Sequence, residues 1–376
     1  MGERFERLLA SKLVSEMRKN HGESIIVAAR DYRIQRVPRI RTGIFMLDYA
    51  LGGGFPAGRT NIVWGNKSTG KSDICVRALA NAQRLCSNCY KTLPAFSSLL
   101  VPDAEGVLDT CSCDDPREHV CAYLDVEGTI DQEWARNHGV DTDTMLLSVP
   151  EYAEQTLDIA EGLLLSGEVD FLVIDSLAFM TPAKEIEEST AKALQAEQAR
   201  VLGRGIRKFG AALNKLGNQT GRRPTLLFTN QVRMKVGLMF GNPETQPGGH
   251  APGFSATTET KTYGGKYDMD ETTGRPIHVD LQFRVEKNKS AGAHIEGEWR
   301  LMLSDGELKK KGEVYEEPLL VEKGLALGLI EKVNNNNWTC LGESHRSKSA
   351  IVKLLATDRA AKQVYTKALM NVLLGA

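Results

Sequence analysis

The sequence predicts an α/β protein with a mostly parallel central sheet. Short apolar runs, several of them β-branched, alternate with helical segments from about residue 40 to residue 305. This pattern is typical of parallel strands that helices cover on both faces. A glycine-rich phosphate-binding signature follows one of these runs, at the point where a helix begins. The length of 376 residues allows two or three domains.

The strands expected in this sheet are short and lie far apart in the chain. They are TNIVWG (60–65), CAYLDVEG (121–128), MLLSVP (145–150), FLVIDSLAFM (171–180), TLLFTNQ (225–231) and IHVDLQFRVEKN (277–288). Before the sheet, residues 1–20 have the spacing of an amphipathic helix, and residues 24–30 form a short strand. Residues 310–376 form a small helical tail. The cysteine-bearing segment 86–121 has little periodicity and interrupts the α/β pattern as an insertion.

Composition limits the partners and the compartment. The formal net charge is −1, from 47 basic and 48 acidic side chains, so any nucleic-acid surface must be local. No apolar run approaches the roughly 18–20 residues that cross a bilayer, so no membrane partner is expected. The N-terminus lacks an apolar signal core, and seven cysteines in such a chain indicate reduced thiols or a metal. We expect a cytoplasmic protein, in the host cytoplasm if a phage encodes it.

The segment GNKSTGKS (65–72) fits the phosphate-loop pattern G-x-x-x-x-G-K-[ST] between a strand and a helix. Its backbone N–H groups can surround phosphate oxygens, and the start of the helix adds partial positive charge. Lys71 would reach the β- and γ-phosphates, and the Ser72 hydroxyl would bind Mg²⁺. The alternative is an incidental turn. The residues expected around the triphosphate are Gly65, Asn66, Lys67, Ser68, Thr69, Gly70, Lys71 and Ser72.

Two further strands end in carboxylates. Asp175 ends an apolar strand and can hold the water shell of the magnesium ion, together with Ser72. Asp125 and Glu127 follow a third strand, and we select Glu127 as the base that orients the attacking water. The alternative for Glu127 is a solvated acid at a strand end. These residues alone indicate a nucleoside triphosphatase.

Five longer stretches strongly resemble the bacterial RecA recombinases, in one order from about residue 15 to residue 355. They are TGIFMLDYALGGGFPAGRTNIVWGNKSTGKS, DVEGTIDQEWARNHGVD, VIDSLAFMTPAKEIE, TNQVRMKVGLMFGNPETQPGGHAPGF and VEKNKS. The resemblance implies a RecA-like ATPase core over 39–305, with DNA loops at about 183–199 and 232–249. It also implies an N-terminal polymerisation arm (1–38) and a small C-terminal domain (306–376).

The resemblance also implies roles in the ATP site. Glu127 would activate water, and Asp175 with Ser176 would support the metal and position the γ-phosphate. Trp134 stands where the family usually has a tyrosine stacked on adenine, and Asp131 falls where an acid contacts the base. The alternative for Trp134 is an ordinary aromatic side chain of the core or the surface.

Three more residues are implicated in catalysis by the resemblance. Gln231 would touch the γ-phosphate and report its presence to the DNA loop that follows. Lys287 and Lys289 would reach the γ-phosphate held by the neighbouring protomer, although their charge pattern alone indicates only a solvated strand face. Basic residues Arg346, Lys348 and Lys353 near the C-terminus either meet incoming duplex DNA or form a solvated helix face.

The expected DNA-binding residues combine phosphate-neutralising charge, backbone N–H groups and apolar side chains that can wedge between bases. The alternative for the methionines and the phenylalanine is packing in the hydrophobic core. The set is Arg200, Arg207, Arg233, Met234, Lys235, Val236, Gly237, Met239, Phe240, Asn242, Gly248 and Gly249.

The insertion carries two close cysteine pairs, Cys86-x2-Cys89 and Cys111-x-Cys113, separated by 21 residues. Two such pairs are what a tetrahedral four-thiolate zinc site needs, and so small an insertion has little core of its own. Cys121 or His119 could replace one member, because C-x-C is the less usual spacing. A fortuitous thiol cluster and a redox pair are the alternatives to a structural zinc ion. Cys75 and Cys340 are expected to be packed thiols.

We therefore expect an ATP-dependent DNA recombinase with ATP and Mg²⁺ as cofactors and a structural Zn²⁺. It would polymerise as a helical filament on single-stranded DNA, pair that strand with homologous duplex DNA and exchange strands. Its partners would be DNA, further copies of itself, and a loader, mediator or single-strand-binding protein. One alternative is a ring-forming helicase or branch-migration motor, which would need a larger N-terminal appendage. The other is a non-catalytic regulator, which the intact phosphate-site residues disfavour. The divergence and the insertion would suit a phage- or plasmid-encoded copy.

Overall fold

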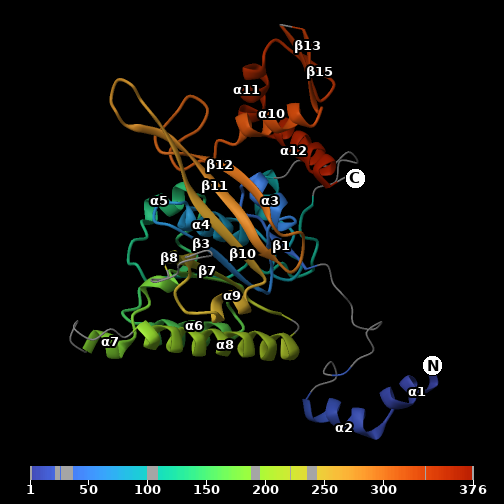
Figure 1. Cartoon of the computed structure of the whole chain (residues 1–376). Helices are drawn as coiled ribbons and strands as arrows, with labels where there is room; N and C mark the ends of the chain where they lie inside the picture. The colour runs from blue at the N-terminus through green and yellow to red at the C-terminus, as the bar shows by residue number, and fades with distance from the viewer. Residues whose placement is uncertain are drawn as a thin grey trace.

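The computed structural model describes residues 2–21, 26, 37–99, 109–187, 195–220, 222–234, 244–334 and 336–374. Its centre is an eight-stranded sheet in the order β12-β11-β10-β3-β7-β6-β4-β5 (Figure 1). The run from β10 to β5 is parallel, and β11 and β12 extend it antiparallel. The mostly parallel sheet predicted from the sequence is therefore confirmed. The strands are β3 (Thr60–Gly65), β4 (Cys121–Asp125), β5 (Met145–Ser148), β6 (Phe171–Asp175), β7 (Thr225–Gln231), β10 (Thr258–Met269), β11 (Pro276–Asn288) and β12 (Ile295–Met302).

Helices cover both faces of this sheet, as Figure 1 shows. Adjacent residues of β3 point to opposite faces, since side chains alternate along a strand. Val63 packs in the cluster that contains α4, whereas Ile62 packs in the cluster that contains α6 and α8. The helices on the first face are α3 (Phe45–Leu51), α4 (Lys71–Gln83) and α5 (Gln132–Asn137), and those on the second are α6 (Ala153–Ser166) and α8 (Gln195–Thr220).

Two long strands, β10 and β12, were not predicted. The β10 sequence, TETKTYGGKYDM, is polar and rich in threonine, and its second half is largely exposed in a hairpin with β11. Its first half, Thr258–Thr262, pairs with β3 and is mostly buried. The apolar alternation used to find strands is missing there, because threonines fill positions inside the sheet and packing against neighbours decides the conformation.

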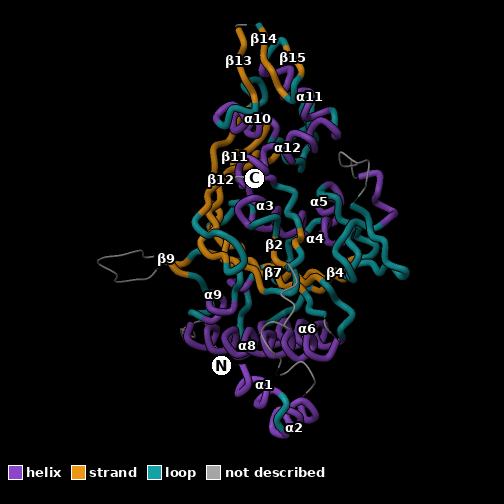
Figure 2. Tube along the Cα trace, turned by 90° about the vertical axis from the view of Figure 1, so that its right-hand side faces the viewer, coloured by secondary structure: helices purple, strands orange, loops and turns teal. Residues whose placement is uncertain are grey.

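The C-terminal helices predicted from the sequence are present as α10 (Glu317–Ala326), α11 (Lys348–Thr357) and α12 (Arg359–Leu374). They share a small core with Ile330 and Cys340. A three-stranded antiparallel meander, which was not predicted, accompanies them and is visible in Figure 2. Its strands are short, and the asparagine run separates β13 from β14, so they carry little apolar pattern. They are β13 (Ile330–Asn334), β14 (Asn337–Cys340) and β15 (Glu343–His345).

The N-terminal segment differs from the single predicted helix. It forms α1 (Gly2–Leu9) and α2 (Lys12–His21), with a break at Ala10 and Ser11. The Ser11 hydroxyl oxygen accepts a hydrogen bond from the Val14 N–H at 3.3 Å, so it caps the second helix. Both helices lie apart from the sheet, beyond α8, in Figures 1 and 2. The strand predicted at 24–30 lies, except for Ile26, outside the described residues.

The remaining elements are short. They are β1 (Arg39–Ile40), β2 (Phe55–Pro56), α7 (Ala183–Glu187), β8 (Arg233–Met234), β9 (Glu244–Thr245), α9 (Ala251–Ser255) and the 3₁₀ turns η2 (Pro94–Leu99) and η3 (Leu177–Phe179). Among the described helices we find none that is long and apolar enough to cross a membrane.

Candidate nucleotide and DNA site

The register of the sheet gathers the predicted catalytic residues at one edge. Gly65 at the end of β3 pairs with Gln231 at the end of β7, and Asp125 at the end of β4 pairs with Asp175 at the end of β6. Because these four strands are parallel neighbours, their carboxyl ends meet at the same edge, where ligands of open α/β sheets bind. Residues that lie far apart in the chain thus surround one space.

The phosphate loop between β3 and α4 has the backbone geometry of an anion cradle. Ser68 and Gly70 both have positive φ, at 60° and 80°. Gly70 is the N-cap of α4 and offers no side-chain cap, so the first N–H groups of the helix can serve an anion. Gly65 must lack a side chain, because a Cβ there would lie 2.4 Å from the Thr262 carbonyl oxygen. The tip residues Asn66, Lys67 and Ser68 are exposed, whereas the Thr69 hydroxyl shares a 2.7 Å hydrogen bond with Thr262.

Lys71 lies in the first turn of α4 and is mostly buried. Its Nζ donates to the Asn66 carbonyl oxygen at 2.6 Å, which folds the ammonium back across the loop. Burial lowers the pKa of Lys71, while the carboxylates of Asp175 and Glu127 oppose that shift. A lysine held this way over the loop can neutralise phosphate charge.

Asp175 is buried and receives three hydroxyl donors. Ser72 Oγ and Tyr123 OH donate to its Oδ2 at 2.7 and 2.6 Å, and the Thr229 hydroxyl donates to Oδ1. Burial, followed by the charge of Asp175, holds the pKa of Tyr123 well above its usual range, so the phenol remains a donor. Hard oxygen ligands at Ser72 and Asp175 fit a magnesium ion and its water shell. Ser176, fully buried beside them, accepts a 3.3 Å hydrogen bond from the Ala178 N–H and caps η3.

Tyr123 and Thr229 were not predicted as site residues. Tyr123 lies two positions before the strand-end acid Asp125, and Thr229 lies two positions before the predicted Gln231. Each pair therefore shares one face of its strand. Polar residues within an otherwise apolar strand were the signal that would have found them.

Glu127 is half-buried just beyond β4, and its Oε1 accepts a 3.2 Å hydrogen bond from Gln231 Nε2. Burial and then the nearby Asp175 charge raise the pKa of Glu127, and the Gln231 bond opposes them. Asp125 serves the backbone instead, because its two oxygens accept N–H groups from Gly128 at 3.0 Å and Ile130 at 2.8 Å. Asp125 therefore stabilises the turn that follows β4, and Glu127 is left as the carboxylate that faces the phosphate loop.

The predicted base-contacting residues lie on α5. Asp131 is the N-cap, and its Oδ1 accepts the N–H groups of Glu133 at 2.7 Å and Trp134 at 3.1 Å. Trp134 is partly buried and packs at the edge of the core on the α4 face, with its ring 4.2 Å from the His138 ring. The core interpretation and the base-stacking interpretation of Trp134 are thus compatible, because one part of the indole packs while another stays accessible.

Lys287 and Lys289 lie away from the phosphate loop of their own chain. Lys287 pairs with Glu259, which pairs with Ile62, three residues before Gly65. That separation corresponds to about 10 Å along the strand. The Lys287 ammonium donates to the Gly253 carbonyl oxygen and lies 3.5 Å from a Glu259 carboxylate oxygen. The Lys289 N–H donates to the Thr257 carbonyl oxygen at 3.0 Å.

The predicted DNA loops are only partly described. Residues 183–199 were expected to be a loop, but Ala183–Glu187 is the helix α7 and α8 begins at Gln195. The described parts, 183–187 and 195–199, are helical because they are rich in alanine, glutamate and glutamine, whereas 188–194 lie outside the described residues. Lys235, Val236, Gly237, Met239, Phe240 and Asn242 lie outside the described residues.

The remaining predicted DNA residues are described. Arg207, Arg233 and Met234 are exposed, and so is Arg200, which forms a 2.6 Å ion pair with Glu197. Gly248 and Gly249 both have positive φ, in a turn that leads into α9. The exposure of Met234, at 62%, argues against core packing for that methionine.

A hydrogen-bond path joins this edge of the sheet to the second predicted DNA loop. Asn230 Nδ2 donates to Gln246 Oε1 at 3.3 Å and to the Pro247 carbonyl oxygen at 3.1 Å, while Gln231 contacts Glu127. β8 and β9 pair as the base of the same loop. The geometry therefore allows a change at Gln231 to reach the segment that follows it.

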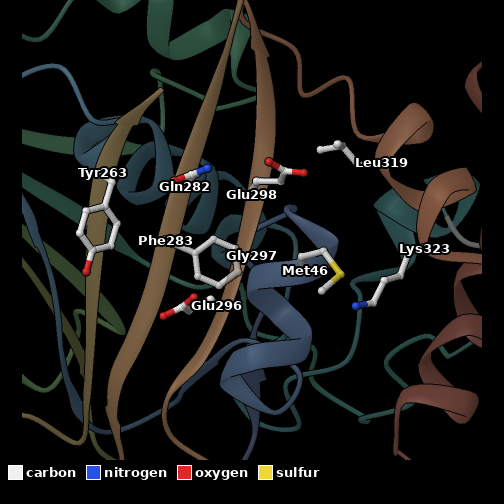
Figure 3. Close-up of a pocket in the computed structure, with 9 residues that line it drawn as sticks. All are labelled: Met46, Tyr263, Gln282, Phe283, Glu296, Gly297, Glu298, Leu319 and Lys323. Atoms are coloured by element: carbon white, nitrogen blue, oxygen red, sulfur yellow. The ribbon is translucent and has the colours of Figure 1, made fainter. Parts of the chain in front are cut away.

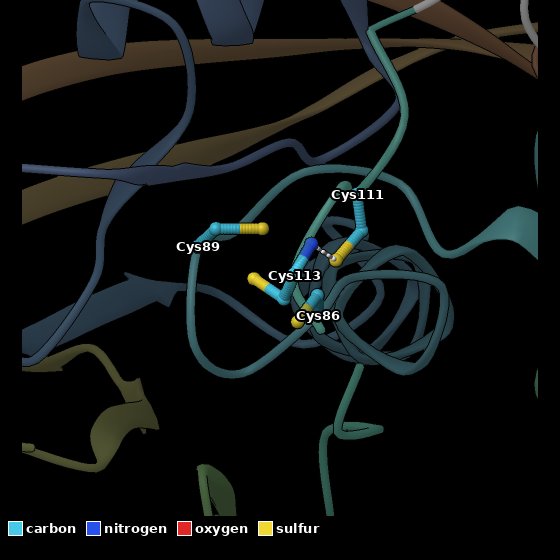
Figure 4. A group of neighbouring side chains, drawn as sticks. All are labelled: Cys86, Cys89, Cys111 and Cys113. Atoms are coloured by element: carbon cyan, nitrogen blue, oxygen red, sulfur yellow. Dashed lines mark hydrogen bonds between the residues drawn. The ribbon is translucent and has the colours of Figure 1, made fainter. Parts of the chain in front are cut away.

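The four cysteines of the insertion converge, as Figure 4 shows. The sulfurs of Cys86, Cys89, Cys111 and Cys113 all lie within 4.8 Å of one another. A tetrahedral Zn²⁺ with Zn–S bonds of about 2.3 Å needs sulfurs roughly 3.8 Å apart, so the set fits with small side-chain movements. The group found among the described residues does not include Cys121 or His119. Cys75 and Cys340 are buried among apolar side chains, as predicted.

Backbone groups around the cysteine cluster complete a compact knuckle. Burial raises the pKa of the Cys86 thiol, but N–H groups of Cys89, Arg117 and Asn88 donate to its sulfur and bring the pKa down to about 7. The Cys113 N–H donates to Cys111 Sγ at 3.4 Å. Apart from the cysteines, the apolar cluster of the insertion contains only Leu93 and, partly buried, Phe96 among the described residues.

A separate cavity of about 470 Å³ lies between α3, the β11–β12 hairpin and α10 (Figure 3). Met46 and Phe283 provide apolar lining, while Glu296, Glu298 and Lys323 provide charge. Its lining includes none of the residues predicted to bind ATP or DNA. The residues predicted to bind the nucleotide therefore lie at the open edge of the sheet and not in this cavity.

The loop between β3 and α4, with carboxylates at the ends of β4 and β6, defines a P-loop nucleoside triphosphate-binding protein. The sequence matches the profile of the RecA N-terminal domain over residues 8–96 and 107–307. The chain belongs to the RecA family, whose members are ATPases.

Individual relatives agree with this assignment. The chain is 33% identical to Protein RecA of Cutibacterium acnes over 336 residues, which cover 89% of this chain and 82% of that protein. It is 31% identical to Protein RecA of Wolbachia sp. subsp. Drosophila simulans over 360 residues, 94% of this chain and 87% of that protein. For Protein RecA of Nitrobacter winogradskyi the identity is 32% over 326 residues, 86% of this chain and 76% of that protein.

Proposed function

We propose that this chain is an ATP-dependent recombinase that polymerises on single-stranded DNA, pairs it with homologous duplex DNA and exchanges the strands. The observation that carries the proposal is the catalytic edge of the sheet. There, Lys71, Glu127, Asp175 and Gln231 surround the phosphate loop, and the segment predicted to bind DNA begins directly after Gln231.

The residues at this edge suit ATP hydrolysis. The phosphate loop and the start of α4 would bind the triphosphate, and Lys71 would neutralise its charge. When bound, Mg²⁺ would neutralise phosphate charge, and Ser72 and Asp175 would hold it. Glu127 would accept the proton of the attacking water. Ser176 would support the position of the γ-phosphate beside Asp175.

The path from Glu127 through Gln231 and Asn230 to residues 246–247 suits communication between ATP and DNA. The γ-phosphate would draw Gln231 away from Glu127, since both groups face the same space. ATP would then favour the DNA-gripping arrangement of the loops, and hydrolysis would release it. The DNA partners of this state would be phosphates at the exposed arginines and bases at Met234 and the following loop.

Exposed apolar surface supports self-assembly. The edge strand β5 exposes Leu146 and Leu147, and Val149 follows it at 59% exposure. Helices α1 and α2 expose Leu8 and Leu13 at 58% and 55%. Unpaired edge strands and apolar helix faces bind other chains readily. We propose that residues 1–38 dock on a neighbouring protomer and that the nucleotide is held between protomers.

The test is a strand-exchange assay with circular single-stranded DNA and a labelled linear duplex. We expect joint molecules only when the duplex is homologous and ATP is present, and ATP hydrolysis should rise with single-stranded DNA. A matched duplex of unrelated sequence is the control. Duplex unwinding without any homology requirement would favour the helicase alternative instead.

The four-cysteine cluster suits one structural zinc ion. The insertion has little apolar core among its described residues, so a metal would supply the cross-link that holds it together. The cluster joins the end of α4 to the chain that enters β4, because Cys86 follows the helix and Cys111 and Cys113 precede the strand. Zinc would thereby fix the insertion on the ATPase core.

Replacement of Cys89 by serine is expected to remove the zinc ion, because the site keeps only three thiolates. Elemental analysis should give one zinc per wild-type chain and close to none for Cys89→Ser. Trypsin should cut the variant within residues 86–121 roughly tenfold faster, since the cross-link is lost. Cys340→Ala, which removes a packed thiol in the C-terminal core, is the control and should retain its zinc. A wild-type chain that takes up no zinc even when supplied with it would contradict this assignment.

A further inference from the structure

A buried carboxylate lies directly beside the phosphate loop and takes no part in the site described above. Asp73, two residues after Lys71, is only 3% exposed. Three side-chain nitrogens surround it: Arg77 Nε at 2.8 Å from the next turn of the same helix, and His138 Nε2 at 2.9 Å and Trp299 Nε1 at 3.3 Å from elsewhere in the chain. Burial raises the pKa of Asp73, but Arg77 and His138 outweigh burial and lower it. The first turn of α4 therefore contains an ionised carboxylate that anchors neighbouring elements.

His138 connects this carboxylate to the base-contacting helix. Its side chain is fully buried at the C-terminal end of α5. While Nε2 faces Asp73, Nδ1 lies 2.7 Å from the carbonyl oxygen of Trp134, and the two rings are 4.2 Å apart. The two ring nitrogens of His138 therefore contact α4 and α5 at the same time, one through the Asp73 carboxylate and the other through the Trp134 carbonyl oxygen.

The surroundings leave His138 little freedom. Gly312 packs against it: a Cβ at Gly312 would lie 3.1 Å from His138 Cε1. Arg77 donates to the Gly312 carbonyl oxygen, so the same arginine holds both the carboxylate and this turn. On the other side, Trp299 packs under Gly70, where a Cβ would lie 2.6 Å from its Cζ2. The network therefore ties together the phosphate loop, α4, α5 and β12.

We infer that His138 is a positioning residue that fixes the Trp134 indole relative to the phosphate loop through Asp73. The base and the triphosphate are then bound by α5 and by the phosphate loop, which the network holds at a fixed distance from each other. This inference rests on the proposed ATP site, in which Trp134 stacks on the base. It goes further, because it makes the affinity for the base, and not that for the phosphates, depend on His138.

The test compares two ligands on His138→Leu, which keeps an apolar side chain against Trp134 but loses both ring nitrogens. Dissociation constants are measured by calorimetry for ATP and for inorganic tripolyphosphate. We expect the value for ATP to rise roughly tenfold, as for a weakened aromatic stack, and that for tripolyphosphate to stay within about twofold. At saturating ATP, kcat should be close to wild type while KM rises. Glu133→Gln, an exposed change on the same helix, is the control.

His138→Gln guards against a folding defect, because its amide can restore one of the two polar contacts. It should give an ATP affinity between those of the wild type and His138→Leu. Equal losses for ATP and tripolyphosphate, or no loss for either, would overturn the role of His138. If wild-type protein bound ATP no more tightly than tripolyphosphate, the base contact itself would be wrong and the inference with it. If it bound neither, the proposed ATP site would fail as a whole.

Discussion

Glu127→Gln is expected to slow ATP hydrolysis by about 10²–10⁴-fold while ATP and single-stranded DNA still bind. The amide fills the same space and can still bond Gln231, but it cannot accept a proton from water. The complexes formed with ATP and DNA should therefore persist. Single-turnover hydrolysis and a DNA-retention assay with ATP measure the two effects separately.

The control for Glu127→Gln is Glu133→Gln, the same chemical change at an exposed position of α5. The acid limb of the wild-type pH profile is a further check. A base must be ionised, and burial together with Asp175 raises the pKa of Glu127. Hydrolysis should thus fall with decreasing pH sooner than an ordinary glutamate would require. An ATP affinity that collapses in Glu127→Gln would move this residue out of the catalytic role.

Lys71→Ala and Lys287→Ala should each lose at least about 100-fold of the DNA-stimulated hydrolysis, yet a mixture of the two should regain part of it. Lys71 lies over the phosphate loop of its own chain, whereas Lys287 lies near the opposite end of the strands, next to Glu259. If Lys287 serves the neighbour's nucleotide, a junction is intact when Lys71 comes from a Lys287→Ala chain and Lys287 from a Lys71→Ala chain. Random order in an equal mixture gives this orientation at about a quarter of the junctions, and the reverse orientation lacks both lysines.

The mixing experiment is read from hydrolysis rates at constant total protein, with each variant alone as the baseline. Lys266→Ala, an exposed lysine on the β10 hairpin, replaces Lys287→Ala in the control mixture and should itself hydrolyse normally. If the hydrolysis rate of the mixture never exceeds the sum of the rates of the two variants alone, the site is complete within one protomer.

The sequence predicted the parts of the fold and the site that local patterns encode. The apolar strands, the phosphate loop and the strand-end acids Asp175 and Glu127 follow from alternation and spacing within single segments. The four-cysteine cluster also followed from the spacing of the cysteines along the chain. Only the structure, however, showed that Cys111 and Cys113 belong to the cluster and that the alternatives Cys121 and His119 do not.

Other features were out of reach of such patterns. The strands β10 and β12 form because β3 and β11 lie next to them, and no apolar alternation marks β10. The Asp73–His138 contact joins residues 65 positions apart, and an aspartate after a phosphate loop resembles an ordinary first-turn helix acid. Features created by tertiary pairing of polar residues were therefore the ones missed.

Electron microscopy of the purified chain with single-stranded DNA and a slowly hydrolysed ATP analogue tests the central claim most directly. The claim is that nucleotide bound between protomers orders the DNA-binding segments and assembles the chain. We predict regular helical filaments with DNA and the analogue together, and none with Lys71→Ala under the same conditions. Dispersed particles of wild-type protein in the presence of both ligands would contradict it.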